Sequence, residues 1–231
     1  MPYRRLPNTN EARIRALEKA VQAGESQNVL QWIIPFDILD EARTLLRRFK
    51  EAQEAYQQSL RAQANSNKKY QTLVKNARLY ISHFIQVLNL AVIRKEIKEE
   101  LKELYGLNPV DYSIPDMLSD TALLSWGKKI IQGENERIQK GGAPIYNPAI
   151  AKVSVHYELF REAFYQQKMH RKNTNRQLGN LNEMRIPIDK IILNVWNSVE
   201  DKFKNLAGEN RMNECRTFGV VYYYRKGEAV Q

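Results

Sequence analysis

The sequence contains little of what most disulfide-stabilised or turn-rich folds require. Its 231 residues include a single cysteine, Cys215, which excludes an intramolecular disulfide framework and a cysteine-rich zinc site. Glycine and proline are scarce, at 10 and 8 residues, and this favours long helices over a β protein with many turns. Nearly apolar runs such as Leu88–Ile93 are far too short to span a bilayer. We therefore expect a helical protein that is not transmembrane.

The N-terminal stretch MPYRRLPNTNEARIR has arginines but no apolar segment after them. A secretory signal needs such a segment, so we expect a soluble, cytoplasmic protein. Hydrophobic residues make up 43% of the chain and charged residues 27%, which is ordinary globular composition and argues against a disordered chain.

Apolar residues recur at helical spacing over most of the sequence. The pattern predicts helices over about 10–23, 37–60, 70–104, 120–140, 149–169 and 181–203, and Ser119 is a candidate N-cap. Pro187 lies within the last of these, and it either kinks that helix or begins it. The tail around FGVVYYY is aromatic and β-branched, which is typical of a strand.

Two stretches about a hundred residues apart resemble each other. YQQSLRAQANSNKKYQ begins at Tyr56 and YQQKMHRKNTNRQL begins at Tyr165. Asn, Ser and Thr form turns readily, so both Asn65–Asn67 and Asn173–Asn175 are predicted turns within helical hairpins. Two hairpins can bury each other's apolar faces, and the similarity then indicates internal duplication. The alternative is a chance likeness between two polar helix surfaces.

The predicted fold class is all-α: an antiparallel four-helix bundle from two duplicated helical hairpins, with extra short helices and a small two-stranded β element that pairs 28–34 with 218–224. One bundle core is expected to contain Phe49, Phe84, Ile85, Phe160, Ile191 and Ile192. The predicted organisation is an N-terminal helix and extended segment (1–35), a first hairpin (36–106), a connector with one helix (107–146), a second hairpin (147–207) and a C-terminal tail or strand (208–231), with 36–207 read as one bundle domain.

No catalytic, cofactor-binding or metal-binding residues can be predicted. None of the three histidines, His83, His156 and His170, has a Glu three residues before it, as carboxylate-bridged metal bundles require. No phosphate-binding loop or nucleophile elbow is present. Arg211 and Arg216 could lower the pKa of Cys215 if its thiol were exposed, whereas a lone cysteine is more commonly a small buried hydrophobe.

The distribution of charge is the most informative feature. Net charge is +10, and no Asp or Glu occurs in residues 55–95 or 163–182. These acid-free windows contain the two predicted turns, which would meet at one end of the bundle. Such a basic end can bind polyanions or serve only as a solvated surface. The candidate polyanion-binding residues are Arg61, Lys68, Lys69, Lys168, Arg171, Lys172 and Arg176.

Three classes of function follow from these observations. The first is a non-catalytic binding or scaffold protein that contacts a polyanion, either nucleic acid or an acidic protein, although no known nucleic-acid-binding motif is present. The second is a self-associating structural or assembly component, and hence a homo-oligomer. The third is an enzyme or metal protein whose site forms only in three dimensions. Because no residue pattern points to catalysis, we expect the first class.

Overall fold

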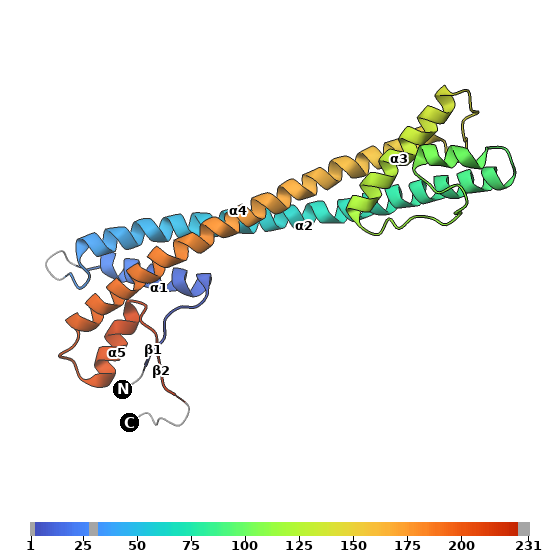
Figure 1. Ribbon diagram of the computed structural model, residues 1–231. Helices are drawn as coiled ribbons and strands as arrows, with labels where there is room; N and C mark the ends of the chain where they lie inside the picture. The colour runs from blue at the N-terminus through green and yellow to red at the C-terminus, as the bar shows by residue number, and fades with distance from the viewer. Residues whose placement is uncertain (1–2, 28–31, 226–231) are drawn as a thin grey trace. The chain divides into compact units, whose positions relative to one another are not determined.

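The structure, a computed structural model, describes residues 3–27 and 32–225, and within them it contains six helices and one two-stranded sheet (Figure 1). The helices are α1 (Asn10–Glu25), α2 (Phe36–Ile93), the 3-10 helix η2 (Glu99–Tyr105), α3 (Asp120–Gln139), α4 (Ile150–Lys202) and α5 (Gly208–Thr217). The strands β1 (Tyr3–Arg4) and β2 (Tyr222–Tyr223) are antiparallel. The predicted all-α class with a small two-stranded sheet is confirmed. Among the described residues, no helix has an apolar stretch that could cross a membrane.

The small sheet forms with a different partner from the predicted one. Tyr223 of β2 pairs with Tyr3 of β1, not with the segment 28–34. Residues 28–31 lie outside the described residues, and 32–34 form no strand. Trp32 instead stacks on Phe36, with 5.2 Å between ring centroids. Pro35 separates the two aromatic residues and leads directly into α2, which leaves no room for an extended strand there.

The two turns predicted at Asn65–Asn67 and Asn173–Asn175 are wrong, and the hairpins that depended on them are absent. α2 continues through the first triplet for a total of 58 residues, and α4 continues through the second for 53. One side chain of each triplet has a partner on the other long helix. Gln167 Nε2 donates to Asn67 Oδ1 at 3.4 Å, and Thr174 Oγ1 donates to the Ser59 carbonyl oxygen at 3.3 Å.

The absence of glycine and proline explains why α2 continues, whereas α4 continues through a proline. No glycine or proline occurs between Pro35 and Gly106, so α2 contains no residue that would readily end it. In α4 the helix passes through Pro187, so that proline neither begins nor ends the element. A proline costs one backbone hydrogen bond within a helix. Burial of Ile188, Ile191 and Ile192 just after it stabilises this part of α4.

The chain divides into two compact units, and α2 and α4 contribute to both. Unit 1 consists of Met1–Leu60 and Asn173–Gln231. Its core joins α1, the first part of α2, the second part of α4, and α5 with the segment after it. Leu17, Phe49, Ile191, Trp196 and Cys215 are all buried in this cluster.

Unit 2 consists of Arg61–Lys172 and has a core of its own. It brings together Phe84 and Ile85 of α2, Tyr105 of η2, Ile130 of α3 and Phe160 of α4. Figure 1 shows η2 and α3 in green and yellow-green beside α2. The expectation of a single core is therefore wrong, because three of its six predicted residues belong to each cluster.

Side-chain caps fix two of the helix starts. Thr9 Oγ1 accepts a hydrogen bond from the Ala12 N–H at 3.1 Å and caps α1. Ser119 Oγ accepts from the Ala122 N–H at 3.1 Å and caps α3, as the sequence predicted. Each bond satisfies one of the backbone donors that a helix leaves unpaired at its first turn.

Two glycine substitutions test the packing of the helices. A Cβ at Gly133 in α3 would lie 2.7 Å from the Leu104 carbonyl oxygen and 2.8 Å from the Tyr105 Cα. Since these are backbone atoms, we expect Gly133→Ala to lower the free energy of unfolding by about 1–3 kcal/mol. A Cβ at Gly179 in α4 would have no neighbour within 4 Å. We expect Gly179→Ala to raise that free energy by about 0.5–1 kcal/mol. Urea denaturation followed by circular dichroism measures the free energy of unfolding of both variants. A Gly133→Ala variant as stable as the natural chain would contradict the close α3–η2 packing.

Candidate functional site

Six of the seven candidate polyanion-binding residues lie in unit 2, on neighbouring parts of α2 and α4. The hydrogen bond from Gln167 to Asn67 places the two acid-free windows side by side within this unit. All six side chains are exposed. We call this set the basic belt: Arg61, Lys68 and Lys69 of α2 with Lys168, Arg171 and Lys172 of α4.

The belt lies within uninterrupted helices, not at a turn end as the sequence analysis expected. α2 and α4 run antiparallel in unit 2, since Phe84 and Phe160 share one cluster while Asn67 contacts Gln167. Arg176, the seventh candidate, belongs to unit 1, where its Nη2 donates to Asn173 Oδ1 at 3.0 Å. The two windows therefore converge because two helices pack along their length.

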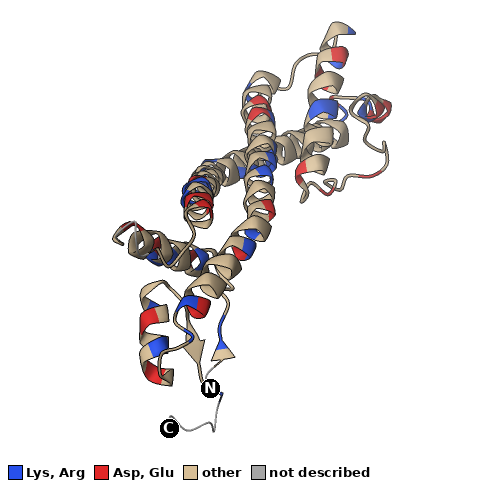
Figure 2. Ribbon diagram, turned by 90° about the vertical axis from the view of Figure 1, so that its left-hand side faces the viewer, with Lys and Arg blue, Asp and Glu red and all other residues tan. Residues whose placement is uncertain are grey.

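Several basic residues of unit 2 outside the belt are paired with carboxylates. Arg94 pairs with Glu96 at 2.8 Å, Lys140 with Glu136 at 2.7 Å, and Arg161 with Glu158 at 2.5 Å. Within the part of the chain that the structure describes, no belt residue forms an ion pair. By sequence, every Asp and Glu of α2 and α4 lies outside residues 55–95 and 163–182. Figure 2 shows Lys and Arg in blue and Asp and Glu in red along the helices. The belt is therefore a surface of uncompensated positive charge.

Helical spacing determines which basic residues share a face of α2 or of α4. Arg61, Lys68 and Lys75 are seven residues apart and so share one face of α2. Adjacent members of this row are separated by about 10 Å along the helix axis. Lys168 and Lys172, four residues apart, share a face of α4. Such rows can contact successive phosphates along a strand, and they carry no side-chain pattern that reads bases.

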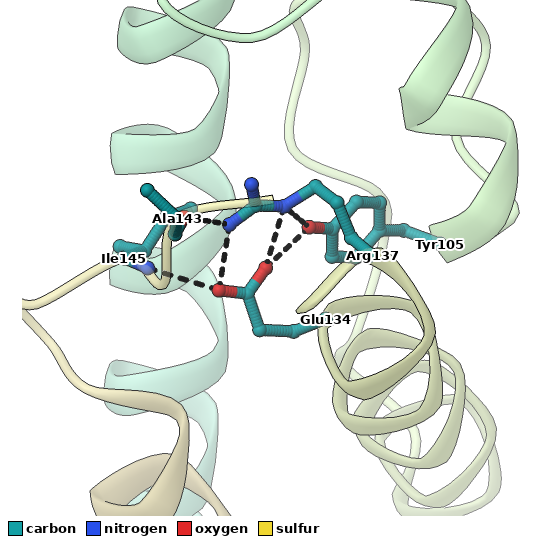
Figure 3. A network of polar contacts seen from close by, with 5 residues as sticks. All are labelled: Tyr105, Glu134, Arg137, Ala143 and Ile145. Carbon is teal, nitrogen blue, oxygen red and sulfur yellow. Dashed lines mark hydrogen bonds and ion pairs between the residues drawn. The ribbon is translucent and has the colours of Figure 1, made fainter. Parts of the chain in front are cut away.

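A buried polar network occupies the other part of unit 2 (Figure 3). Glu134 of α3 is fully buried and Arg137 is 3% exposed. Arg137 Nη2 donates to Glu134 Oε1 at 2.8 Å, and the Tyr105 hydroxyl donates to Glu134 Oε2 at 2.5 Å. Arg137 also donates to the Ala143 carbonyl oxygen, and Glu134 Oε1 accepts from the Ile145 N–H at 2.9 Å. The network ties η2, α3 and the segment after α3 together.

The polar atoms of this network have partners, and this indicates a structural role. Burial and the hydrogen bond to Glu134 raise the pKa of the Tyr105 phenol, so the hydroxyl stays protonated and continues to donate. Sequence reasoning missed the network. Glu134 and Arg137 are three residues apart on α3, a spacing common on exposed helix faces, and only Gly133 beside them hints at close packing.

Lys102 is a second buried charge in unit 2. Its ammonium donates to the carbonyl oxygens of Pro109 at 3.1 Å and Asp111 at 2.6 Å, and it lies 4.1 Å from the Tyr112 ring centroid. Burial lowers the pKa of this lysine. The carbonyl oxygens and the aromatic face hold the cation against the segment that follows η2. The arrangement fixes a loop and leaves no free side for a reactant.

The residues considered for metal or thiol chemistry are dispersed. His156 stacks on Tyr80, with 4.0 Å between ring centroids. Among the described residues, no three His, Cys, Asp or Glu side chains are close enough to hold a metal ion. Cys215 is buried in unit 1, and burial raises the pKa of its thiol. The raised pKa disfavours the thiolate that nucleophilic chemistry needs.

Removing one charge tests the buried network. Glu134→Gln keeps the shape of the side chain but leaves the Arg137 guanidinium buried without its carboxylate. We expect this substitution to lower the free energy of unfolding by about 3–5 kcal/mol. Tyr105→Phe, which leaves the ion pair intact, should cost about 1–3 kcal/mol. Denaturant titrations of both variants measure the difference, and equal effects would show that the hydroxyl matters as much as the charge.

Comparison with family models, curated proteins and solved structures finds no match to this chain.

Proposed function

We propose that this protein is a non-catalytic binding protein that contacts the phosphate backbone of nucleic acid through the basic belt. The observation that carries the proposal is that the segment with Arg61, Lys68 and Lys69 lies beside the segment with Lys168, Arg171 and Lys172, and that neither helical segment contains an Asp or Glu. Each phosphate contact releases condensed counterions, which drives association without base recognition. The acid-free windows also avoid the like-charge repulsion that Asp or Glu would exert on a phosphate strand.

The test uses fluorescence anisotropy with a mixed-sequence DNA duplex and a single-stranded RNA, at several salt concentrations. The variant reverses four belt charges: Lys68→Glu, Lys69→Glu, Lys168→Glu and Lys172→Glu. Exposed charges contribute little to stability, so the fold should persist by circular dichroism. On duplex DNA we expect binding to weaken at least a hundredfold. The slope of log K against log salt should become shallower by about 3–4, since each lost contact removes about 0.9.

A matched control reverses four exposed cations elsewhere: Arg43→Glu, Arg47→Glu, Lys140→Glu and Lys204→Glu. These side chains lie in local ion pairs outside the belt. Both variants have the same net charge. Equal weakening by the two variants would mean that binding reflects net charge alone, and no binding by the natural chain at low salt would overturn the proposal.

A specific surface on α4 favours self-association as a second candidate function. Val155, Leu159 and Met169 are 58%, 45% and 68% exposed, and Tyr165 is 55% exposed. Positions 155, 159, 162, 166 and 169 alternate by four and three residues, the spacing at which one helix contacts another. The polar residues Glu162 and Gln166 occupy two of these positions, and Tyr165 lies beside the row. We call Val155, Leu159, Tyr165 and Met169 the α4 stripe.

The charges along the stripe indicate an antiparallel second copy as the partner. Glu158 and Glu162, with Arg161 between them in sequence, lie in its first half, and Lys168 and Lys172 lie within and just after its second half. A copy running antiparallel about an axis near Tyr165 would place Leu159 against Met169 and the acidic half against the basic half. A parallel copy would place like charges together, which costs free energy.

Sedimentation velocity over a range of concentrations tests this second candidate. Leu159→Glu with Met169→Glu should abolish any dimer, whereas Leu79→Glu with Leu90→Glu, exposed positions of α2 in the same unit, should not. The charge-swap variants Glu158→Lys/Glu162→Lys and Lys168→Glu/Lys172→Glu should each be monomeric. Mixed together, they should form a heterodimer because their charges complement each other. A natural chain that stays monomeric at high concentration would exclude the interface.

A further inference from the structure

Unit 1 contains a hollow whose positive charges are also uncompensated. It has a volume of about 600 Å³ and lies between the segment that leads into α1, one face of α1, and the segment after α5. Cavities of about 300–1,000 Å³ are the usual size for small-molecule sites. We call it the α1 pocket. Its cationic lining residues are Arg5, Arg15, Lys19 and Arg216.

The face of α1 explains why one hollow collects these side chains. Ala12, Arg15, Ala16 and Lys19 are spaced at i, i+3, i+4 and i+7, and so point to one side of the helix. The two alanines leave space and the two cations border it. Trp196 of α4 and Val220 also lie in the lining but are almost fully buried, whereas Leu6 and Val221 are about half exposed and supply its accessible apolar surface. The pocket therefore combines an apolar floor, formed by Leu6, Val221 and the alanine face of α1, with a basic rim.

Neighbouring cations of unit 1 are paired with carboxylates, and those of the pocket are not. Arg13 makes two hydrogen bonds to Asp189 at 2.7 and 2.9 Å, and Arg4 pairs with Glu200 at 3.1 Å. Of the residues that the structure describes, no Asp or Glu lines the pocket. Among the described residues, none of the four rim cations forms an ion pair, although Arg216 Nη1 donates to Asn213 Oδ1 at 2.9 Å. A bound anion would relieve the repulsion among them.

Backbone contacts hold the walls of the pocket in place. The Arg5 N–H donates to the Val221 carbonyl oxygen at 2.8 Å, next to the β1–β2 pair. Gly219 has a φ of +84°, and a Cβ there would lie 2.6 Å from the Ala16 carbonyl oxygen. Only glycine allows this close approach in that conformation. The segment after α5 is thus fixed against α1, and the pocket is formed before any ligand arrives.

From this combination we infer that the α1 pocket binds a nucleoside phosphate. The phosphates would lie among the rim guanidinium and ammonium groups, where arginine forks match phosphate oxygens. The base would lie against the accessible apolar lining beside Ala12, where Leu6 and Val221 are about half exposed. The side-chain amide of Asn8, which also lines the pocket, offers a donor and an acceptor to a base edge or a ribose hydroxyl.

Isothermal titration calorimetry with the full chain tests the inference, with ADP as the probe. Pyrophosphate and adenosine each represent one half of the ligand. We expect ADP to bind at least tenfold more tightly than either, because only ADP uses both rim and floor. Equal binding of pyrophosphate would overturn the assignment of a nucleoside ligand, as would equal binding of adenosine or the absence of any ADP binding.

Matched variants locate the binding of ADP. Arg15→Gln and Arg216→Gln should each weaken it about tenfold, since a hydrogen bond to a charged group contributes about 1.5–3 kcal/mol. Arg43→Gln removes the same charge from a residue of unit 1 outside the pocket lining, and it should leave binding unchanged. Ala12→Leu fills the floor with a good helix former and should abolish binding of ADP while leaving the helical circular dichroism intact.

The belt variant described above separates the two proposals. It should bind ADP like the natural chain, because none of its four residues lines the pocket. Loss of ADP binding in the belt variant would place the ligand outside the pocket and overturn the inference.

Discussion

The structure depends on the continuity of α2 and α4, because neither helix lets the chain fold back within it. α2 has no glycine or proline, and α4 continues through both Gly179 and Pro187. A helix alone in water gains little stability from its backbone, so these helices depend on tertiary packing of their apolar faces. Each unit supplies that packing with short elements: α1 and α5 in unit 1, and η2 and α3 in unit 2.

The sequence predicted where the helices lie, but it predicted only some of their ends correctly. Apolar spacing located the buried residues Phe49, Phe84 and Ile191, and the Ser119 cap of α3 follows from the preference for serine at helix starts. The turn at Asn65–Asn67 failed because the tendency of Asn and Ser to form turns is weak where no glycine or proline accompanies it. Tertiary bonds such as Gln167 to Asn67 then decide the conformation, and these cannot be read from one segment.

Functional surfaces were predicted only where composition alone reveals them. The basic belt was visible as two windows without acids, although its position was assigned to a turn end. The Glu134–Arg137 network and the α1 pocket were not visible, because each needs several elements to meet. In the sequence, Arg15 and Lys19 resemble ordinary surface cations. They line a pocket because the segment after α5 packs on the same face of α1.

The charged residues fall into three physical situations, and each has a different consequence. Glu134 and Arg137 are buried and fully paired, so they specify packing. Exposed pairs such as Arg47 with Glu51 contribute little beyond solubility. The belt and the pocket have cations without carboxylate partners, and these leave electrostatic free energy for a ligand to gain. A convex row favours a long polyanion without selectivity, whereas a concave site with an apolar floor favours a small anion of defined shape.

Lys168 and Lys172 belong to the basic belt and also flank the α4 stripe. They cannot contact phosphates and the acidic half of a second copy at the same time. Nucleic acid and a second copy would therefore compete for these two lysines, and by linkage each would weaken the other's binding by the same factor. Salt weakens the charge contacts of both nucleic-acid binding and self-association. It should weaken nucleic-acid binding more, because salt does not screen the apolar burial of Leu159 and Met169 in the dimer. Low salt then favours the complex with nucleic acid, and high salt favours self-association.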